Sequence, residues 1–134
     1  KMMSELLIVA ATICMEARGE PWAGKVMVAE VIANRARQAH SKPGKVCLVP
    51  RQFSCWRSND TQTAVGWARK QRSWPDSLAI ARNICQPGYK STSPATHFFN
   101  PELANPAWAK EMQLVAIVGR HHFYAVNTKP KKSR

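Results

Sequence analysis

Two glutamates four residues apart, Glu16 and Glu20, are the side chains of this sequence best suited to acid–base chemistry. Gly19 and Pro21 stand beside them. Glycine commonly ends a helix and proline suits the first turn of one, so we expect one helix to end near Arg18 and the next to begin near Pro21. The two carboxyls would then lie on either side of a junction between helices.

Such a junction places the two carboxyls in opposite electrostatic environments. Glu16 lies near the negative end of the first helix dipole and follows an apolar run from Leu6 to Met15, and both effects favour its neutral form. Glu20 begins the second helix, where unpaired N–H groups favour its anion. A pair of carboxyls separated in this way keeps one acid protonated near neutral pH, as cleavage of a glycosidic bond requires.

A plainer interpretation is favoured by the spacing alone, because carboxylates four residues apart are common on helices. In that interpretation Glu16 pairs with Arg18 or Lys25 on a solvated face, and Glu20 only caps the second helix. The choice depends on whether the rest of the chain builds a site around Glu16.

Charge is the strongest feature of the composition. The 134 residues are enough for one domain with one core, and 20 Lys and Arg against 8 Asp and Glu give a net charge of +12. This excess predicts a polyanionic partner, either nucleic acid or an anionic bacterial envelope. A small basic nucleic-acid-binding protein without enzymatic activity is therefore the alternative function, with Arg35, Arg37 and Arg69 near aromatic residues.

Helical periodicity predicts most of the architecture. We expect helices over residues 4–18 and 21–38, a short one over 61–70 capped by Asn59 or Asp60, and one that begins near Pro75. The second is the most regular, with an apolar stripe of Trp22, Val26, Ala29, Ile32, Ala33 and Ala36. Pro43, Gly44 and Pro50 predict an irregular loop around residues 45–49.

The C-terminal third predicts loops and a hairpin. Residues 89–107 form a polar loop, a short helix follows over 108–113, and 114–118 with 122–126 form a small hairpin. The fold class is therefore mainly α with a small β-hairpin (α+β), as one domain over 1–126. Residues 127–134 are basic and lack apolar side chains, so we expect them to form a disordered tail.

Two clusters mix ring faces with amide and hydroxyl groups, as binding of sugars with acetamido arms requires. Core packing of the aromatics and a surface role for the histidine are the plainer alternatives. The candidate substrate-binding residues are Phe53, Ser54 and Trp56 in one cluster, and His97, Phe98, Asn100 and Tyr124 in the other.

The four cysteines form no C-x-x-C pair, so we expect no zinc site, and nothing in the sequence calls for a cofactor. Cys47 and Cys55 flank one loop, and a disulfide between them is an open possibility. Cys14 and Cys85 lie in helical patterns, which predicts buried thiols.

Five stretches in order resemble the cell-wall hydrolase family that includes the spore-cortex-lytic enzymes. The resemblance runs from about Ile8 to Tyr124. Its carriers are Glu16-Ala17-Arg18-Gly19-Glu20-Pro21, Val28-Ala29-Glu30-Val31-Ile32-Ala33-Asn34-Arg35, Gln52-Phe53-Ser54-Cys55-Trp56, Ala95-Thr96-His97-Phe98-Phe99-Asn100-Pro101 and Gly119-Arg120-His121-His122-Phe123-Tyr124.

That resemblance implies a lysozyme-like single domain that acts on peptidoglycan. We expect a monomer that binds no specific nucleic acid. The resemblance implies cleavage between N-acetylmuramic acid and N-acetylglucosamine by a lytic transglycosylase or muramidase, with Glu16 as the general acid. Glu20 is the one other acidic residue in a catalytic motif, and we expect it to hold Arg18 or the helix start in place. The single-acid transglycosylase route is therefore favoured, and hydrolysis stays open.

The chain has little beyond the catalytic domain, and in this it resembles a compact phage endolysin more than a secreted spore enzyme. Lys1 and the apolar run up to Cys14 superficially resemble a signal peptide, but we find no small-residue cleavage site. We therefore expect bacteriolytic action in the cell wall (periplasm) after release from the host cytoplasm during lysis. A fragment of a longer chain would have the same sequence features.

Overall fold

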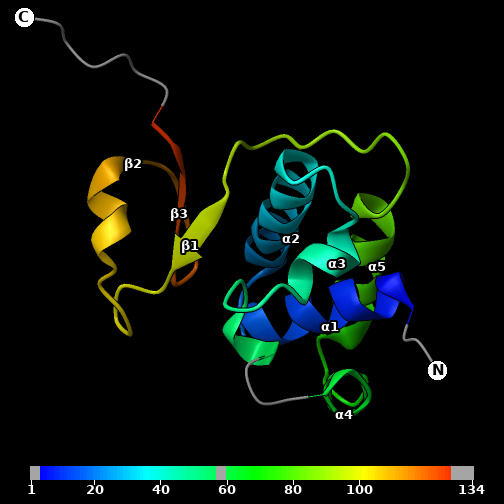
Figure 1. Cartoon of the computed structure of the whole chain (residues 1–134). Helices are drawn as coiled ribbons and strands as arrows, with labels where there is room; N and C mark the ends of the chain where they lie inside the picture. Colours follow the sequence, from blue (N-terminus) through cyan, green and yellow to red (C-terminus); the bar gives the residue numbers. More distant parts are fainter. Residues whose placement is uncertain (1–3, 57–59, 128–134) are drawn as a thin grey trace, which may run out of the picture.

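The computed structural model describes residues 4–56 and 60–127, as a helical part and a small antiparallel sheet (Figure 1). Helix α2 lies between the sheet and the other helices, and η2 lies on the far side of the sheet (Figure 1). The elements are α1 Glu5–Glu16, α2 Trp22–Gln38, α3 Pro43–Cys47, η1 Ser54–Trp56, α4 Thr61–Ala68, α5 Trp74–Ile84, β1 His97–Phe99, η2 Ala107–Glu111, β2 Met112–Val118 and β3 His121–Val126.

The junction predicted between the first two helices is confirmed. Helix α1 begins after Ser4, whose hydroxyl accepts from the backbone N–H of Leu7, and it ends at Glu16. Gly19 then adopts a φ of +76°, a conformation that favours glycine, and the chain turns into α2 after Pro21. Glu16 therefore occupies the last turn of α1, as its position in the sequence predicted.

The main core surrounds α1, which packs against the other four helices. Burial follows the predicted stripe of α2 except at its start, because Trp22 lies in the first turn and is 52% exposed. That prediction for Trp22 was wrong. The largest apolar side chains of α1 and α2 that are fully buried are Ile13, Ile32, Val9, Val28 and Val31.

The predicted hairpin is confirmed, and a third strand joins it. Strand order is β1-β3-β2, with His97 opposite Tyr124 and Phe99 opposite His122. The prediction that residues 89–107 form only a loop was wrong for β1. Its three residues are too short for a periodic pattern, and their partners lie more than twenty positions along the chain.

The sheet has one face in the core and one covered by η2. Phe98 and Phe123 pack in the core clusters, whereas Phe99 and Tyr124 stack on the opposite face with ring centroids 5.5 Å apart. Trp108 of η2 lies edge-on against both rings of that face. Alternation along β1 therefore separates core from outward-facing rings.

Shorter elements follow local signals closely. The side chain of Asp60 accepts from the backbone N–H of Thr63 and caps α4, and α5 begins after Ser73, both as predicted. Residues 43–47 form the one-turn helix α3 rather than an irregular loop, because Pro43 suits the first turn of a helix. The predicted tail lies outside the described residues from position 128 onward.

All four cysteines lie in the described part of the chain, and no disulfide joins Cys47 to Cys55. Cys14 is buried, as predicted, whereas Cys85 is only half-buried. Burial raises the pKa of Cys47 to about 12, so this thiol is neutral at physiological pH. These thiols contribute to packing and not to a covalent crosslink.

A buried anion fixes the long connection from α5 to the sheet. Glu30 on α2 is 1% exposed and accepts from the backbone N–H groups of Thr92 and Ser93, at 2.8 and 2.7 Å. Tyr89 also donates its hydroxyl to this carboxylate. One turn further, Asn34 donates to the carbonyls of Ser93 and Ala95. Helix α2 thereby determines where β1 begins.

Candidate active site

Glu16 is half-buried where the end of α1 meets η1. The backbone N–H of Cys55 donates to Oε2 of Glu16 over 3.2 Å. The side chains of Cys55 and Ser54 also act on this carboxyl, and both lower its pKa. Two segments separated by 39 residues therefore meet at this one group, which excludes the interpretation of Glu16 as a solvated surface residue.

The surroundings of Glu16 favour its neutral form. Burial is the largest influence and raises the pKa of the carboxyl above its usual value. Hydrogen bonds from Cys55 and Ser54 and the positive charge of Arg35 offset this rise only in part. Burial and the neighbouring Glu16 also raise the pKa of the Cys55 thiol, which stays protonated. The carboxyl of Glu16 therefore stays protonated, and can donate its proton, at a higher pH than an ordinary glutamate.

Neither cation proposed as a surface partner of Glu16 binds it. The guanidinium of Arg18 lies over the ring of Trp67, at 5.1 Å from its centroid. Lys25 donates to the backbone carbonyl of Glu20. The plainer interpretation of Glu16 was therefore wrong, because both cations have other partners.

Arg35 is the cation that acts on Glu16, and it also organises the surrounding segments. Its Nε donates to the carbonyl of Thr96 over 2.6 Å, and one terminal nitrogen donates to the backbone and side-chain oxygens of Gln52, both at 3.1 Å. Its guanidinium lies 4.9 Å from the centroid of Phe53. One side chain of α2 therefore joins the loop before η1 to the start of β1.

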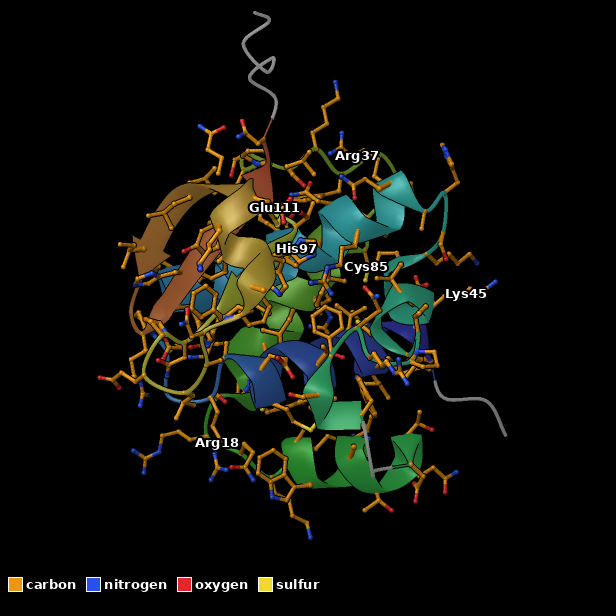
Figure 2. All side chains as sticks on the ribbon, turned by 60° about the vertical axis from the view of Figure 1, so that its left-hand side comes forward. Arg18, Arg37, Lys45, Cys85, His97 and Glu111 are labelled. Carbon is orange, nitrogen blue, oxygen red and sulfur yellow. The ribbon has the colours of Figure 1, made fainter. Side chains whose placement is uncertain are left out.

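A hollow of about 620 Å³ opens beside Arg35. Its lining includes Gln52 and Trp108, together with His97 and Phe98 of the second predicted cluster. Figure 2 shows His97 between η2 and α2. Burial and the charge of Arg35 lower the pKa of His97, so its imidazole is neutral near pH 7. The hollow combines ring faces and uncharged polar groups with the guanidinium groups of Arg35 and Arg51.

The predicted binding residues divide into two groups. Ser54 reaches Glu16, His97 lines the hollow beside Arg35, and Tyr124 belongs to the aromatic face of the sheet. The other four have contacts within the fold, although Phe53 and Trp56 also line a hollow of about 730 Å³ with Ser54, and Phe98 also lines the hollow beside Arg35. Phe53 is 4% exposed, Trp56 donates its indole N–H to buried Thr12, Phe98 packs in the core, and Asn100 accepts from the N–H of Glu102.

Glu20 faces a different part of the molecule. It is 6% exposed, and its carboxylate accepts from the backbone N–H and from Nε of Arg120, at 2.9 and 3.0 Å. A Cβ on Gly119 would lie 2.2 Å from Oε1 of Glu20, so this close approach requires glycine at the hairpin turn. Glu20 holds the turn between β2 and β3 against the α1–α2 junction. Its partner is Arg120, so the prediction of Arg18 was wrong.

The site residues that sequence analysis missed are Arg35 and Trp108. We considered Arg35 only as a nucleic-acid contact. The signal that could have found Arg35 is its place at the end of one of the five family-like stretches. Among the described residues, no group of three His, Cys, Asp or Glu side chains could hold a metal ion.

A sequence model of one protein family, described as Cell Wall Hydrolase, matches residues 19–124 of the chain. The chain belongs to the cell wall hydrolase family. The matched range contains Arg35 and both groove clusters, and Glu16 precedes it by three residues. None of the helices within the described residues of this cell wall hydrolase has the length and apolar character needed to cross a membrane.

Relatives of this cell wall hydrolase include two spore cortex-lytic enzymes. That of Oceanobacillus iheyensis is 27% identical over 122 residues, which are 90% of this chain and 41% of the relative. That of Bacillus cereus is 29% identical over 123 residues, which are 90% of this chain and 44% of the relative. The chain therefore spans about two fifths of the length of these curated relatives.

Two solved structures have the same fold as this cell wall hydrolase. The catalytic domain of the germination-specific lytic transglycosylase SleB from Bacillus anthracis is 27% identical, with a TM-score of 0.66 that covers 92% of this chain and 96% of that one. The catalytic domain of the Bacillus cereus SleB protein is 27% identical, with a TM-score of 0.65 over 90% and 88%. These similarities confirm the predicted lysozyme-like fold.

Proposed function

We propose that this cell wall hydrolase cleaves peptidoglycan glycan strands between N-acetylmuramic acid and N-acetylglucosamine, with Glu16 as the general acid. The observation that carries the proposal is the half-buried carboxyl of Glu16, whose pKa is raised by burial. Membership of the family and the likeness to a lytic transglycosylase domain support the substrate class. They also favour this function over the nucleic-acid-binding alternative.

In the proposed reaction the protonated Glu16 donates its proton to the bridging oxygen of the glycosidic bond. The electron pair of the bond between C1 and that oxygen leaves with the oxygen, and the muramic ring becomes oxocarbenium-like. Arg35 and the N–H of Cys55 then stabilise the Glu16 carboxylate that remains. The 6-hydroxyl of the same sugar attacks C1 and returns its proton to Glu16, which forms a 1,6-anhydro product.

The single-acid route is supported by the position of Glu20. An inverting or retaining hydrolysis uses a second carboxylate beside the sugar, and the carboxylate of Glu20 is bound to Arg120 instead. We therefore favour intramolecular capture by the 6-hydroxyl over capture by water.

Digestion of purified peptidoglycan followed by mass analysis of the released muropeptides tests this function. We expect disaccharide-peptides that are one water lighter than the hydrolysis products, because the anhydro bond replaces addition of water. Products with a reducing end would support glycan cleavage but assign it to hydrolysis. Release of peptides from uncut glycan strands would contradict the proposal.

We further propose a bacteriolytic, endolysin-like role for the protein, supported by the net charge of +12. A positive field attracts an anionic envelope over about 30 Å at 0.01 M salt and only about 8 Å at physiological ionic strength. Lysis of permeabilised cells should therefore fall as salt rises, whereas cleavage of a short soluble glycan at saturating concentration should change little. Equal inhibition of both reactions by salt would contradict this role of the charge.

A further inference from the structure

A second hollow, of about 380 Å³, lies where the end of α1 and η1 meet α4. Met15 precedes Glu16 in the chain, and Cys55 donates the hydrogen bond that holds its carboxyl. The hollow is therefore next to the proposed acid and distinct from the one beside Arg35. It is lined by Met15, Arg18, Cys55, Thr63, Ala64 and Trp67.

An exposed cation and an exposed ring form one wall of this hollow. The guanidinium of Arg18 lies 5.1 Å from the centroid of Trp67, and Trp67 is 38% exposed. Figure 2 shows Arg18 beside α4, at the bottom of the view. A cation that lies over a ring face is held in place while its N–H edges remain open to other groups.

The N–H groups of Arg18 differ from those of Arg35 and Arg120, which are engaged by oxygen atoms of the protein. Arg120 is paired with Glu20, and Arg35 donates to carbonyls of Thr96 and Gln52. Within residues 4–56 and 60–127, by contrast, no carboxylate lies within ion-pair distance of Arg18. The hollow thus offers a planar guanidinium fork beside apolar surface, which suits a carboxylate carried on a short chain.

We propose that this hollow binds a carboxylate of the peptide stem that the muramic sugar carries; the proposal rests on the proposed function. The stem is attached to the sugar whose glycosidic bond is cleaved, so a site that borders Glu16 is within its reach. Trp67 and Met15 provide apolar contacts for the stem, and Arg18 provides two parallel donors for its carboxylate. The protein then distinguishes stem-bearing strands from bare glycan.

The test compares kcat/KM on two soluble substrates: glycan strands with intact stems, and the same strands after the stems are removed by an amidase. We expect the wild-type protein to prefer stem-bearing strands by roughly tenfold, the effect of one partly solvated charge-assisted hydrogen-bond pair. Arg18→Gln should reduce this ratio toward one, and Arg18→Lys should retain part of it. Arg69→Gln, which removes the same charge from an exposed position just after α4, should leave the ratio at its wild-type value.

Chemical amidation of the stem carboxylates gives a second readout. Wild-type protein should lose most of its preference for stem-bearing strands when they are amidated, because the stem and its apolar contacts remain but its charge is lost. A ratio that Arg18→Gln does not change, or one that amidation does not change, would overturn the stem site. If the wild-type protein cleaved neither substrate, the proposed glycan cleavage itself would be contradicted.

Discussion

The backbone N–H of Cys55 donates a hydrogen bond of 3.2 Å to Oε2 of Glu16. This contact connects the last turn of α1 with η1, the two segments that carry the first motif and the first aromatic cluster of the sequence. It orients one oxygen of the carboxyl while burial favours the protonated group. The position of the proposed acid therefore depends on the loop as much as on its own helix.

The raised pKa of Glu16 predicts how stability varies with pH. Because the folded protein holds this proton more tightly than the unfolded chain, the stabilisation is complete below the unfolded pKa, near 4.5, and is lost as pH rises through the folded value. Glu16→Gln removes this dependence. The free energy of unfolding of the variant relative to wild type should therefore increase from pH 4 to neutral pH, as measured by urea denaturation. A constant or decreasing difference would contradict the raised pKa.

Arg35 should affect both the rate and its pH dependence. Arg35→Gln removes a charge that lowers the pKa of Glu16 and removes the hydrogen bonds to Thr96 and Gln52. We expect kcat/KM on purified glycan strands to fall roughly tenfold or more, the factor for losing a charge-assisted hydrogen bond. The alkaline limb of the pH profile should move to higher pH.

Arg37→Gln is the matched control for Arg35, because it lies on the same helix and is exposed. Its guanidinium donates to Oδ1 of Asn34 over 3.5 Å, and Arg37 lies at the top of the view in Figure 2. This variant should keep the wild-type pH profile. If the pH profile of the Arg35→Gln variant also stayed at its wild-type position, the proposed electrostatic effect of Arg35 on Glu16 would be contradicted.

Glu20→Gln should reduce stability and only part of the activity. The amide cannot replace the charge that faces Arg120, and we expect a loss of about 1–3 kcal/mol in the free energy of unfolding. Glu102→Gln, at an exposed position, should leave stability unchanged within error. Complete inactivity of Glu20→Gln with wild-type stability would instead assign Glu20 a catalytic role.

Ser54, His97 and Tyr124 are three predicted binding residues that do not belong to the buried core. Alanine at each position should reduce cleavage of peptidoglycan more than it reduces the thermal midpoint, because these side chains act on Glu16, line the hollow beside Arg35 or belong to the aromatic face. Alanine at the exposed Gln62 of α4 serves as control. Loss of stability in proportion to loss of activity would assign the three residues to packing.

Local signals in the sequence were sufficient for the helices and the hairpin, but not for contacts between distant segments. The cap of α4 at Asp60 and the turn at Gly19 depend on neighbouring residues, so they could be predicted. Strand β1 depends on pairing with β3, more than twenty residues later. A three-residue strand has no periodicity of its own, so only its partner identifies it.

The same distinction applies to the site. Glu16 could be predicted because the helix end and the apolar run before it are local features. The partner of Glu20, by contrast, lies 100 residues away at Arg120. Trp56 was grouped with the stacking residues, and it lines a hollow with Ser54, but its composition did not indicate that its N–H donates to the buried Thr12. Aromatic composition alone could not distinguish core rings from groove rings.

Glu16→Gln tests the central claim most directly, because the amide keeps the shape of the side chain but cannot donate the proton. Wild-type and variant proteins are incubated with purified sacculi, and turbidity is followed together with thermal unfolding. We predict a loss of activity of roughly 10²–10⁴-fold or more, the contribution of a general acid. The thermal midpoint should be at least that of wild type at neutral pH. Lysis at the wild-type rate by a folded Glu16→Gln variant would contradict the assignment of Glu16 as the acid.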